Sequence, residues 1–194
     1  DATARRLVLA RDRFGKKPLY YAPLGDPAGR QGLVFASELR ALLAHPQVRD
    51  ERTVDTVAVA QYLVHEYVPQ PRSILANVRK LGPGEMLVWD EAHGLRIERY
   101  YSPRYGTRLR GNPDVLRQGL LDRVDRAVAR RLVADVPVGV FLSGGLDSSL
   151  VAALAVRHHP HIQTFAIGFD DPSFDEREHA AAVAQHLGTT HHVE

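Results

Sequence analysis

The spacing of apolar residues divides the chain into a first part dominated by short strands and a second part in which strands and helices alternate. In the first part, apolar runs separated by turn-rich segments predict strands at 5–10, 18–22, 32–37, 81–90 and 95–101. The last two are expected to pair through the short turn 91–94. The pattern is typical of an α+β segment.

Two helices interrupt these predicted strands. One spans 37–46 and is expected to end at Pro46, because proline cannot continue a helix. The other begins after Thr53, a good N-cap residue. Its apolar positions recur at helical spacing and are expected to lie near one helical face: Val54, Val57, Ala60 and Val64.

The second part follows an aperiodic segment, 101–111, which is the best candidate for a linker. Asn112 and Pro113 are typical of the start of a helix, and the apolar residues after them recur every four positions. The remaining elements alternate: strand 138–142, helix 147–158, strand 162–167, helix 176–187 and a strand from about 190. This alternation predicts a parallel sheet with helices over its faces. We therefore expect two domains, 1–105 and 112–194.

Composition narrows the class of protein. The 194 residues include 25 Lys and Arg against 23 Asp and Glu, a formal net charge of +2, which does not indicate nucleic-acid binding. The chain has no cysteine, so it holds neither a disulfide, a thiolate metal site nor a cysteine nucleophile. No apolar stretch approaches the roughly 18 residues of a membrane span. We expect a cytoplasmic protein that does not bind membranes, and we expect the sequence to be a fragment that is cut at both ends. The sequence leaves open whether the protein forms a homodimer.

Residues 138–154, VGVFLSGGLDSSLVAAL, place a Ser-Gly-Gly turn between a strand and a helix. Such a turn lies at the carboxyl edge of the sheet, where backbone N–H groups and the helix dipole favour an anion such as phosphate. The segment has no lysine, which excludes a Walker A loop. Asp147 would repel phosphate unless a cation intervenes, and Mg²⁺ accepts oxygen ligands from both groups. The simpler alternative is an ordinary turn capped by Asp147 and Ser148.

The sequence SGGLDSS resembles the pyrophosphate loop of the ATP pyrophosphatases, an adenine nucleotide α-hydrolase-like family that includes asparagine, GMP and NAD synthetases. The resemblance implies ATP and Mg²⁺ as cofactors, with Asp147 on the metal. It assigns phosphate contacts to Ser143, Gly144, Gly145, Ser148 and Ser149. Backbone groups at Leu142, Ile167 and Gly168 would hold adenine and ribose.

The first part, with ARDRFGKKPLYY at 10–21 and FASELRALLAHP at 35–46, resembles the C-terminal portion of an N-terminal-nucleophile glutaminase sandwich. Together the two parts resemble glutamine-dependent asparagine synthetases of the B type. The resemblance implies ATP, glutamine and aspartate as substrates, a catalytic cysteine upstream of this chain, and binding of the glutamine α-amino group by Asp12. The alternative is that Asp12 and Arg13 only start a turn.

Two other functions remain open from the sequence. An adenylating relative such as a β-lactam synthetase would act on a different carboxylate, and an inert nucleotide-binding module would catalyse nothing. The histidines near the C-terminus do not predict zinc, because no third ligand stands at a suitable spacing. We expect His158, His159 and His161 to be exposed, and a role for His191 and His192 near the nucleotide is left unassigned.

Overall fold

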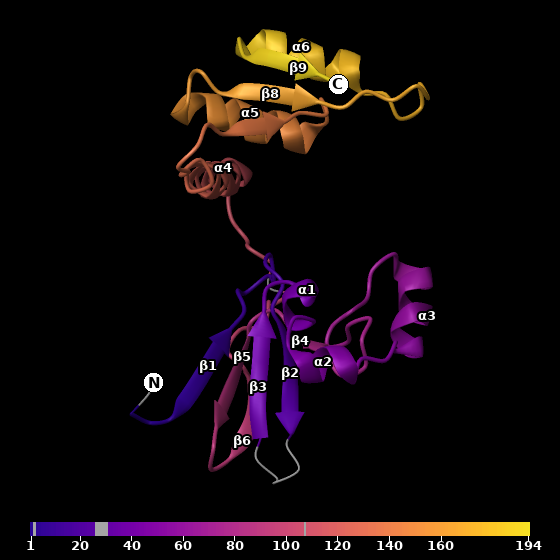
Figure 1. The fold of residues 1–194 in the computed structure, drawn as a ribbon. Coiled ribbons are helices and arrows are strands. Elements are labelled where there is room, and N and C mark those ends of the chain that lie inside the picture. The colour runs from indigo at the N-terminus through magenta and orange to yellow at the C-terminus, as the bar shows by residue number, and fades with distance from the viewer. Residues whose placement is uncertain (2, 26–30, 107) are drawn as a thin grey trace. The chain divides into compact units, whose positions relative to one another are not determined.

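The computed structural model describes residues 1, 3–25, 31–106 and 108–194. The chain folds into two compact units, Asp1–Gly106 and Thr107–Glu194, which are treated separately. Figure 1 labels the elements of both units along the chain. No described helix combines the length and apolar character needed to cross a membrane.

The first unit contains two antiparallel sheets. One has the order β1-β5-β6, with strands Arg6–Ala10, Glu85–Asp90 and Gly94–Arg99. The other has the order β3-β2-β4, with strands Gln31–Ala36, Tyr20–Gly25 and Arg79–Lys80. The five predicted strands and the β5–β6 pairing are confirmed. Apolar residues from both sheets share one core: Leu9, Tyr21, Leu81 and Leu87.

Two short helices, α1 (Leu39–Leu42) and α2 (Pro46–Asp50), pack on the second sheet through a core that includes Ala22, Leu42 and Val48. The prediction that a helix ends at Pro46 is wrong, because Pro46 begins α2. A proline at the first helical position loses no hydrogen bond, since the N–H it lacks would have no acceptor there.

Helix α3 spans Thr56–His65 and begins two residues later than expected. Its N-cap is Asp55, whose carboxylate accepts hydrogen bonds from the Val57 and Ala58 amides, so the prediction of Thr53 as the cap is wrong. Of its residues, Ala58 is fully buried, whereas Val57 and Val64 are 48% and 75% exposed.

The second unit is a three-stranded parallel sheet with three helices. Asn112 caps α4 (Pro113–Ala129) as predicted, its side chain accepting the Asp114 amide hydrogen. Next come β7 (Gly139–Phe141), α5 (Leu146–His158), β8 (Gln163–Ala166), α6 (Arg177–Leu187) and β9 (Thr190–Val193). The strands are parallel in the order β7-β8-β9, which confirms the predicted parallel sheet.

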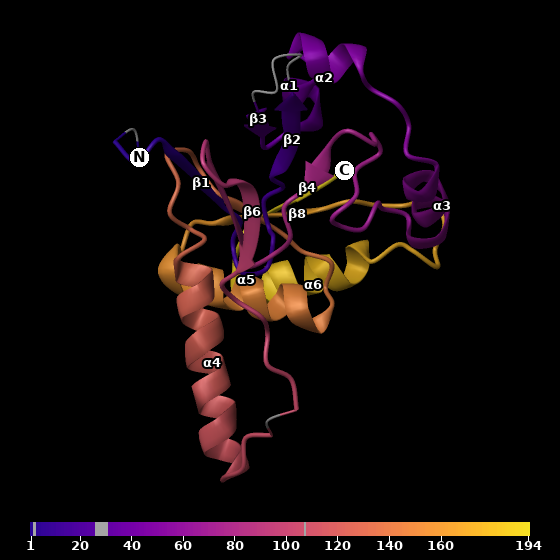
Figure 2. The same ribbon diagram turned by 90° about the horizontal axis from the view of Figure 1, so that it is seen from below.

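Within the described residues of this unit, helices cover one face of the sheet. Leu142 and Ala166 pack there against small residues of α5 and α6, and α4 packs outside α5 through Val128. Figure 2 shows α5 and α6 on the same side of β8. The expected helices are thus present, and in the described residues they lie over one face. Alternate residues point to the other face, where Phe141 and Ile167 are 76% and 58% exposed.

Candidate functional site

The turn from Leu142 to Ser149 joins β7 to α5 at the carboxyl edge of the sheet. Gly145 is the N-cap of α5 and has no side chain to accept a hydrogen bond. The backbone N–H groups of Leu146, Asp147 and Ser148 therefore have no acceptor among the described residues. Three free amides at the positive end of a helix of this length suit an anionic ligand.

Two serine hydroxyls shape this turn. The Ser143 and Ser148 hydroxyl oxygens lie 2.9 Å apart, and the Ser148 hydroxyl also donates to the Gly145 carbonyl at 3.1 Å. The Gly145 amide donates to the Ser143 hydroxyl at 3.3 Å. The turn is therefore held in shape by its own hydrogen bonds. The Ser149 hydroxyl is buried and has no partner in the described part of the chain.

Strands β7 and β8 separate where the turn begins. The Leu142 amide donates to the Phe165 carbonyl at 2.8 Å, which continues the parallel ladder by one step. The following step, from the Ile167 amide to the Leu142 carbonyl, is missing, and neither group has another partner among the described residues. A free donor and a free acceptor therefore face the gap between the strand ends.

The backbone amide of Gly168, in contrast, already has a hydrogen-bond acceptor. This amide donates to the Glu194 carbonyl at 2.6 Å, so that donor is already used. A Cβ at this position would stand 2.6 Å from Cδ of Arg177. A side chain at Gly168 would require Arg177 to shift, and only the Gly168 carbonyl stays available to a ligand.

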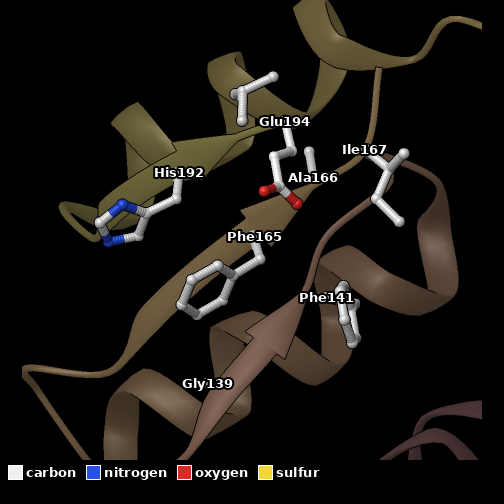
Figure 3. Close-up of a pocket in the computed structure, with 8 residues that line it drawn as sticks. Gly139, Phe141, Phe165, Ala166, Ile167, His192 and Glu194 are labelled. Atoms are coloured by element: carbon white, nitrogen blue, oxygen red, sulfur yellow. The ribbon is translucent and has the colours of Figure 1, made fainter. Parts of the chain in front are cut away.

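A hollow of about 360 Å³ opens at these strand ends. Apolar residues line much of it, and the polar residues Ser143, Ser148 and Glu176 complete its wall. A second hollow of about 570 Å³ lies on the uncovered face and shares Phe141, Phe165, Ala166 and Ile167 with the first. Figure 3 shows Phe165 and His192 side by side on that face, with Phe141 and Ile167 toward one end.

Asp147 is exposed on the first turn of α5 and forms no hydrogen bond or ion pair with any described residue. The described residues contain no group of three His, Cys, Asp or Glu side chains that could hold a metal ion. A cation at Asp147 would therefore take most of its ligands from a bound phosphate and from water. The free carboxylate beside free amides fits a magnesium–phosphate ligand, since Mg²⁺ keeps several waters and binds through one or two carboxylates.

Asp12 lies in the first unit, after β1, in a turn closed by its own side chain. Its carboxylate accepts hydrogen bonds from the Phe14 and Lys17 amides at 3.0 and 3.3 Å. Partial loss of solvent raises the pKa of Asp12, but backbone hydrogen bonds from Lys16, Phe14 and Lys17 outweigh it and the pKa lies below 3.8. The carboxylate is therefore charged at neutral pH.

Arg11, which the sequence did not single out, clamps this turn. Its guanidinium donates to the Lys17, Leu81 and Gly15 carbonyls at 2.9, 2.7 and 2.8 Å. The sequence contains the adjacent pair Arg11 and Asp12, and only Asp12 was predicted to have a role. The clamp fixes the Asp12 turn to the segment that leads into β5.

The C-terminal histidines have separate surroundings. His191 Nδ1 lies 2.9 Å from the buried Thr164 hydroxyl, in the first half of the strands and on the helix side. His192 lies on the uncovered face and stacks on Phe165, with ring centroids 4.9 Å apart. His158, His159 and His161 are exposed, as expected, and His158 Nε2 lies 3.0 Å from a carboxylate oxygen of Asp125.

Comparison with known proteins assigns a family to each part of the chain. A family model described as a glutamine amidotransferase domain matches residues 1–101, and one described as asparagine synthase matches residues 119–194. A provisionally named asparagine synthetase (glutamine-hydrolyzing) of Mycobacterium bovis is 37% identical over 98% of this chain and 29% of its own length. Asparagine synthetase (glutamine-hydrolyzing) 1 of Bacillus subtilis is 33% identical over 92% of this chain and 27% of its own length.

A more distant relative has a different name. The amidase chyE of Penicillium rubens is 30% identical over 100% of this chain and 30% of its own length. The chain thus spans less than a third of the length of these curated relatives. The glutamine amidotransferase match by itself covers more than half of the chain. The chain therefore belongs to the glutamine amidotransferase family, as a member that joins this domain to an asparagine synthase segment, the combination found in glutamine-dependent asparagine synthetases.

Proposed function

We propose that this chain is part of an ATP-dependent, amide-forming ligase that makes asparagine from aspartate with nitrogen from glutamine. Residues 1–105 would be the C-terminal part of its glutaminase domain, and residues 112–194 the first part of its ATP-pyrophosphatase domain. The observation that carries the proposal is the turn from Leu142 to Ser149, with three free amides, a free carboxylate and a gap between strand ends.

The reaction has three balanced steps. Glutamine and water give glutamate and ammonia at the glutaminase domain. At the other domain, a β-carboxylate oxygen of aspartate attacks the α-phosphorus of ATP, and the bond between the α and β phosphates breaks to release pyrophosphate. Ammonia then attacks the β-aspartyl adenylate carbonyl and expels AMP, which leaves asparagine. Adenylation is needed because an oxide is a poor leaving group whereas AMP is a good one.

The turn would bind the leaving pyrophosphate. The free amides of the first turn of α5, together with Ser143, Gly144, Gly145 and Ser148, surround the space that the β and γ phosphates would fill. Negative charge grows on the pyrophosphate as its bond to the α-phosphorus breaks. Fixed amide dipoles aimed at that charge stabilise the transition state more than the ground state. The phosphate contact of Ser149 stays a prediction, because its hydroxyl is buried.

The gap between β7 and β8 would bind the adenine. The Ile167 amide and the Leu142 carbonyl lack partners, so they can donate to a ring nitrogen and accept from the amino group of the base. The apolar walls at Phe141 and Phe165 would cover the faces of the ring. Gly168 can take part only through its carbonyl, because its amide is committed to Glu194.

Asp147 would hold Mg²⁺ together with the phosphates. When bound, the ion would neutralise charge on the phosphate oxygens. The chain contributes the Asp147 carboxylate, which no other described residue contacts. It lies at the end of α5 that would face the phosphates. On the glutaminase side, the charged Asp12 carboxylate would attract the α-ammonium group of glutamine. The cysteine nucleophile of that family would lie outside these residues, which include no cysteine.

The proposal is tested by aspartate-dependent exchange of labelled pyrophosphate into ATP, measured on the natural protein that contains this chain. Asp147→Asn should reduce the exchange at least tenfold and raise the Mg²⁺ concentration needed. Asp170→Asn, an exposed aspartate that does not line the hollow, is the matched control. Exchange that is unchanged in Asp147→Asn would remove the metal role, and absence of exchange in the unmodified protein would remove the proposed chemistry.

A second candidate is an amide-forming reaction on another carboxylate, which the match to the amidase chyE keeps open. The same exchange assay separates the two, because only the true acceptor acid supports exchange. Exchange with a different carboxylic acid and not with aspartate would favour this candidate. Nucleotide binding without exchange on any acid would favour an inert binding module.

A further inference from the structure

The segment from Gly168 to Arg177 links β8 to α6 and is held in one shape by a clamp. Nε of Arg177 lies 2.8 and 2.9 Å from the two carboxylate oxygens of Asp175, and an Nη atom donates to the Phe169 carbonyl at 3.4 Å. The Arg177 side chain also lies against Gly168, with no room for a Cβ. Both ends of the segment are thereby tied to one guanidinium.

Hydrogen bonds inside the segment add to this order. The Asp171 carboxylate accepts from the amide and the hydroxyl of Ser173 at 2.9 and 2.8 Å, and the Phe174 amide donates to the Asp171 carbonyl at 3.0 Å. The connection is therefore a structured loop. Three of its residues line the 360 Å³ hollow: Phe169, Phe174 and Glu176.

Glu176 is the carboxylate of this hollow and has no partner among the described residues. It is exposed at the N-cap of α6, and its side chain makes no capping hydrogen bond. The neighbouring Arg177 is already committed to Asp175. The Glu176 oxygens thus keep their full capacity to accept hydrogen bonds from something that enters the hollow.

The residues that line the hollow indicate which hydrogen-bond donor Glu176 would bind. The hollow combines exposed aromatic side chains, Phe169 and Phe174 at 52% and 68% exposure, with the Ser143 and Ser148 hydroxyls of the phosphate turn. A nucleotide placed with its base in the gap between β7 and β8, against Phe141 and Phe165, and with its phosphates on the turn has its sugar between the two, in the same hollow. The sugar carries neutral hydroxyl donors, which a carboxylate binds by charge-assisted hydrogen bonds.

We propose that Glu176 is a specificity residue that accepts hydrogen bonds from the ribose hydroxyls of the nucleotide. The clamp by Arg177 and Asp175 holds the loop that positions Glu176. The inference rests on the proposed function, because it assumes that the turn from Leu142 to Ser149 binds the phosphates. A contact with phosphate oxygens is ruled out by charge repulsion, and a metal contact is distinguished by the experiment.

The experiment measures equilibrium binding of AMP, 2′-deoxy-AMP and 3′-deoxy-AMP by calorimetry in EDTA, with the natural protein that contains this chain. AMP needs no metal, so the sugar contact is isolated from Mg²⁺. Glu176→Gln should weaken AMP binding about 10- to 100-fold, as expected for loss of a hydrogen bond to a charged group. The unmodified protein should bind at least one deoxy analogue more weakly than AMP, and Glu176→Gln should not weaken that analogue further.

The matched control is Glu178→Gln, which removes a carboxylate two residues along the same helix and outside the hollow. It should leave all three affinities unchanged, and thermal unfolding of both variants checks that the fold is intact. Equal weakening of AMP and both deoxy analogues by Glu176→Gln would overturn the ribose contact. Unchanged AMP binding in EDTA would also overturn it, and a raised Mg²⁺ requirement in the pyrophosphate exchange assay would then make Glu176 a metal ligand instead. If the unmodified protein binds no AMP, the proposed nucleotide site itself fails.

Discussion

A Cβ built on Gly144 would stand 2.5 Å from Cβ of His179, in the first turns of α6. Gly144 also has a φ of 80°, a left-handed conformation that side chains disfavour. The phosphate turn therefore packs directly on a second helix. The first of its two glycines is needed for this packing, whatever the ligand contacts.

The two glycines of the turn should respond differently to substitution. Gly144→Ala should lower the free energy of unfolding by about 1–3 kcal/mol from backbone strain alone, and further from the clash with α6. Gly145 has a φ of −69°, and a Cβ there would only touch the Ser143 hydroxyl at 3.4 Å. Gly145→Ala should therefore keep stability but weaken ATP binding, because its Cβ approaches the phosphates. Urea unfolding and calorimetric titration separate the two effects.

The free energy of unfolding of the first unit should depend on pH through the carboxyl group of Asp90. Hydrogen bonds from the His93 amide and ring, opposed by desolvation and aided by Arg96, lower the pKa of Asp90 from 3.8 to about 2. The unfolded chain therefore binds a proton more readily than the folded chain. The stabilisation by Asp90 is complete above about pH 4 and is lost as the pH falls toward 2.

Asp90→Asn should lower the unfolding temperature at pH 6, and its difference from the unmodified chain should narrow between pH 4 and pH 2. Thermal unfolding followed by circular dichroism across this range measures the effect. Asp170→Asn, on the surface of the other unit, should keep the full pH dependence. A constant difference at all pH values would show that Asp90 acts through packing.

Glutamine binding should depend on Asp12 and on its clamp. Asp12→Asn removes the charge that would attract the α-ammonium group, so the KM for glutamine should rise about 10- to 100-fold. Synthesis with free ammonia should change little, because it bypasses glutamine. Arg11→Lys cannot replace the three hydrogen bonds of the guanidinium and should raise the KM for glutamine by a smaller factor. An equal loss of ammonia-dependent synthesis in either variant would argue against a glutamine contact.

The hydrogen bonds around His191 should be structural. The Thr164 hydroxyl lies 2.9 Å from both His191 Nδ1 and the Thr189 hydroxyl, and Thr164 is fully buried. Thr164→Val keeps the side-chain shape but leaves His191 Nδ1 without this partner, at a cost of about 1–3 kcal/mol. Urea unfolding should show the loss, while the affinity for ATP stays the same. A weaker affinity for ATP would place this network in the nucleotide site after all.

Local patterns in the sequence predicted most elements of both units. The strand of residues 138–142, the helix after it and the capping of α4 by Asn112 all depend on neighbours within a few residues, and the structure has them at or near the predicted bounds. The two incorrect helix limits, at Pro46 and Thr53, lie where proline and short polar residues are compatible with either a start or a stop. Asp55 is the cap through hydrogen bonds from the Val57 and Ala58 amides, and its carboxylate also pairs with Arg72, which is distant in sequence.

In the candidate site too, some features follow from the sequence and others only from the tertiary structure. The sequence by itself determined which groups the turn from Leu142 to Ser149 offers to the proposed phosphates, because small residues, one carboxylate and no lysine occur within a single stretch. Only the tertiary structure decided that Gly144 is needed for packing on α6, that the Gly168 amide is already used, and that Glu176 shares a hollow with Ser143. These relationships join residues that are tens of positions apart, and their distances follow from how strands and helices pack, which no local pattern encodes.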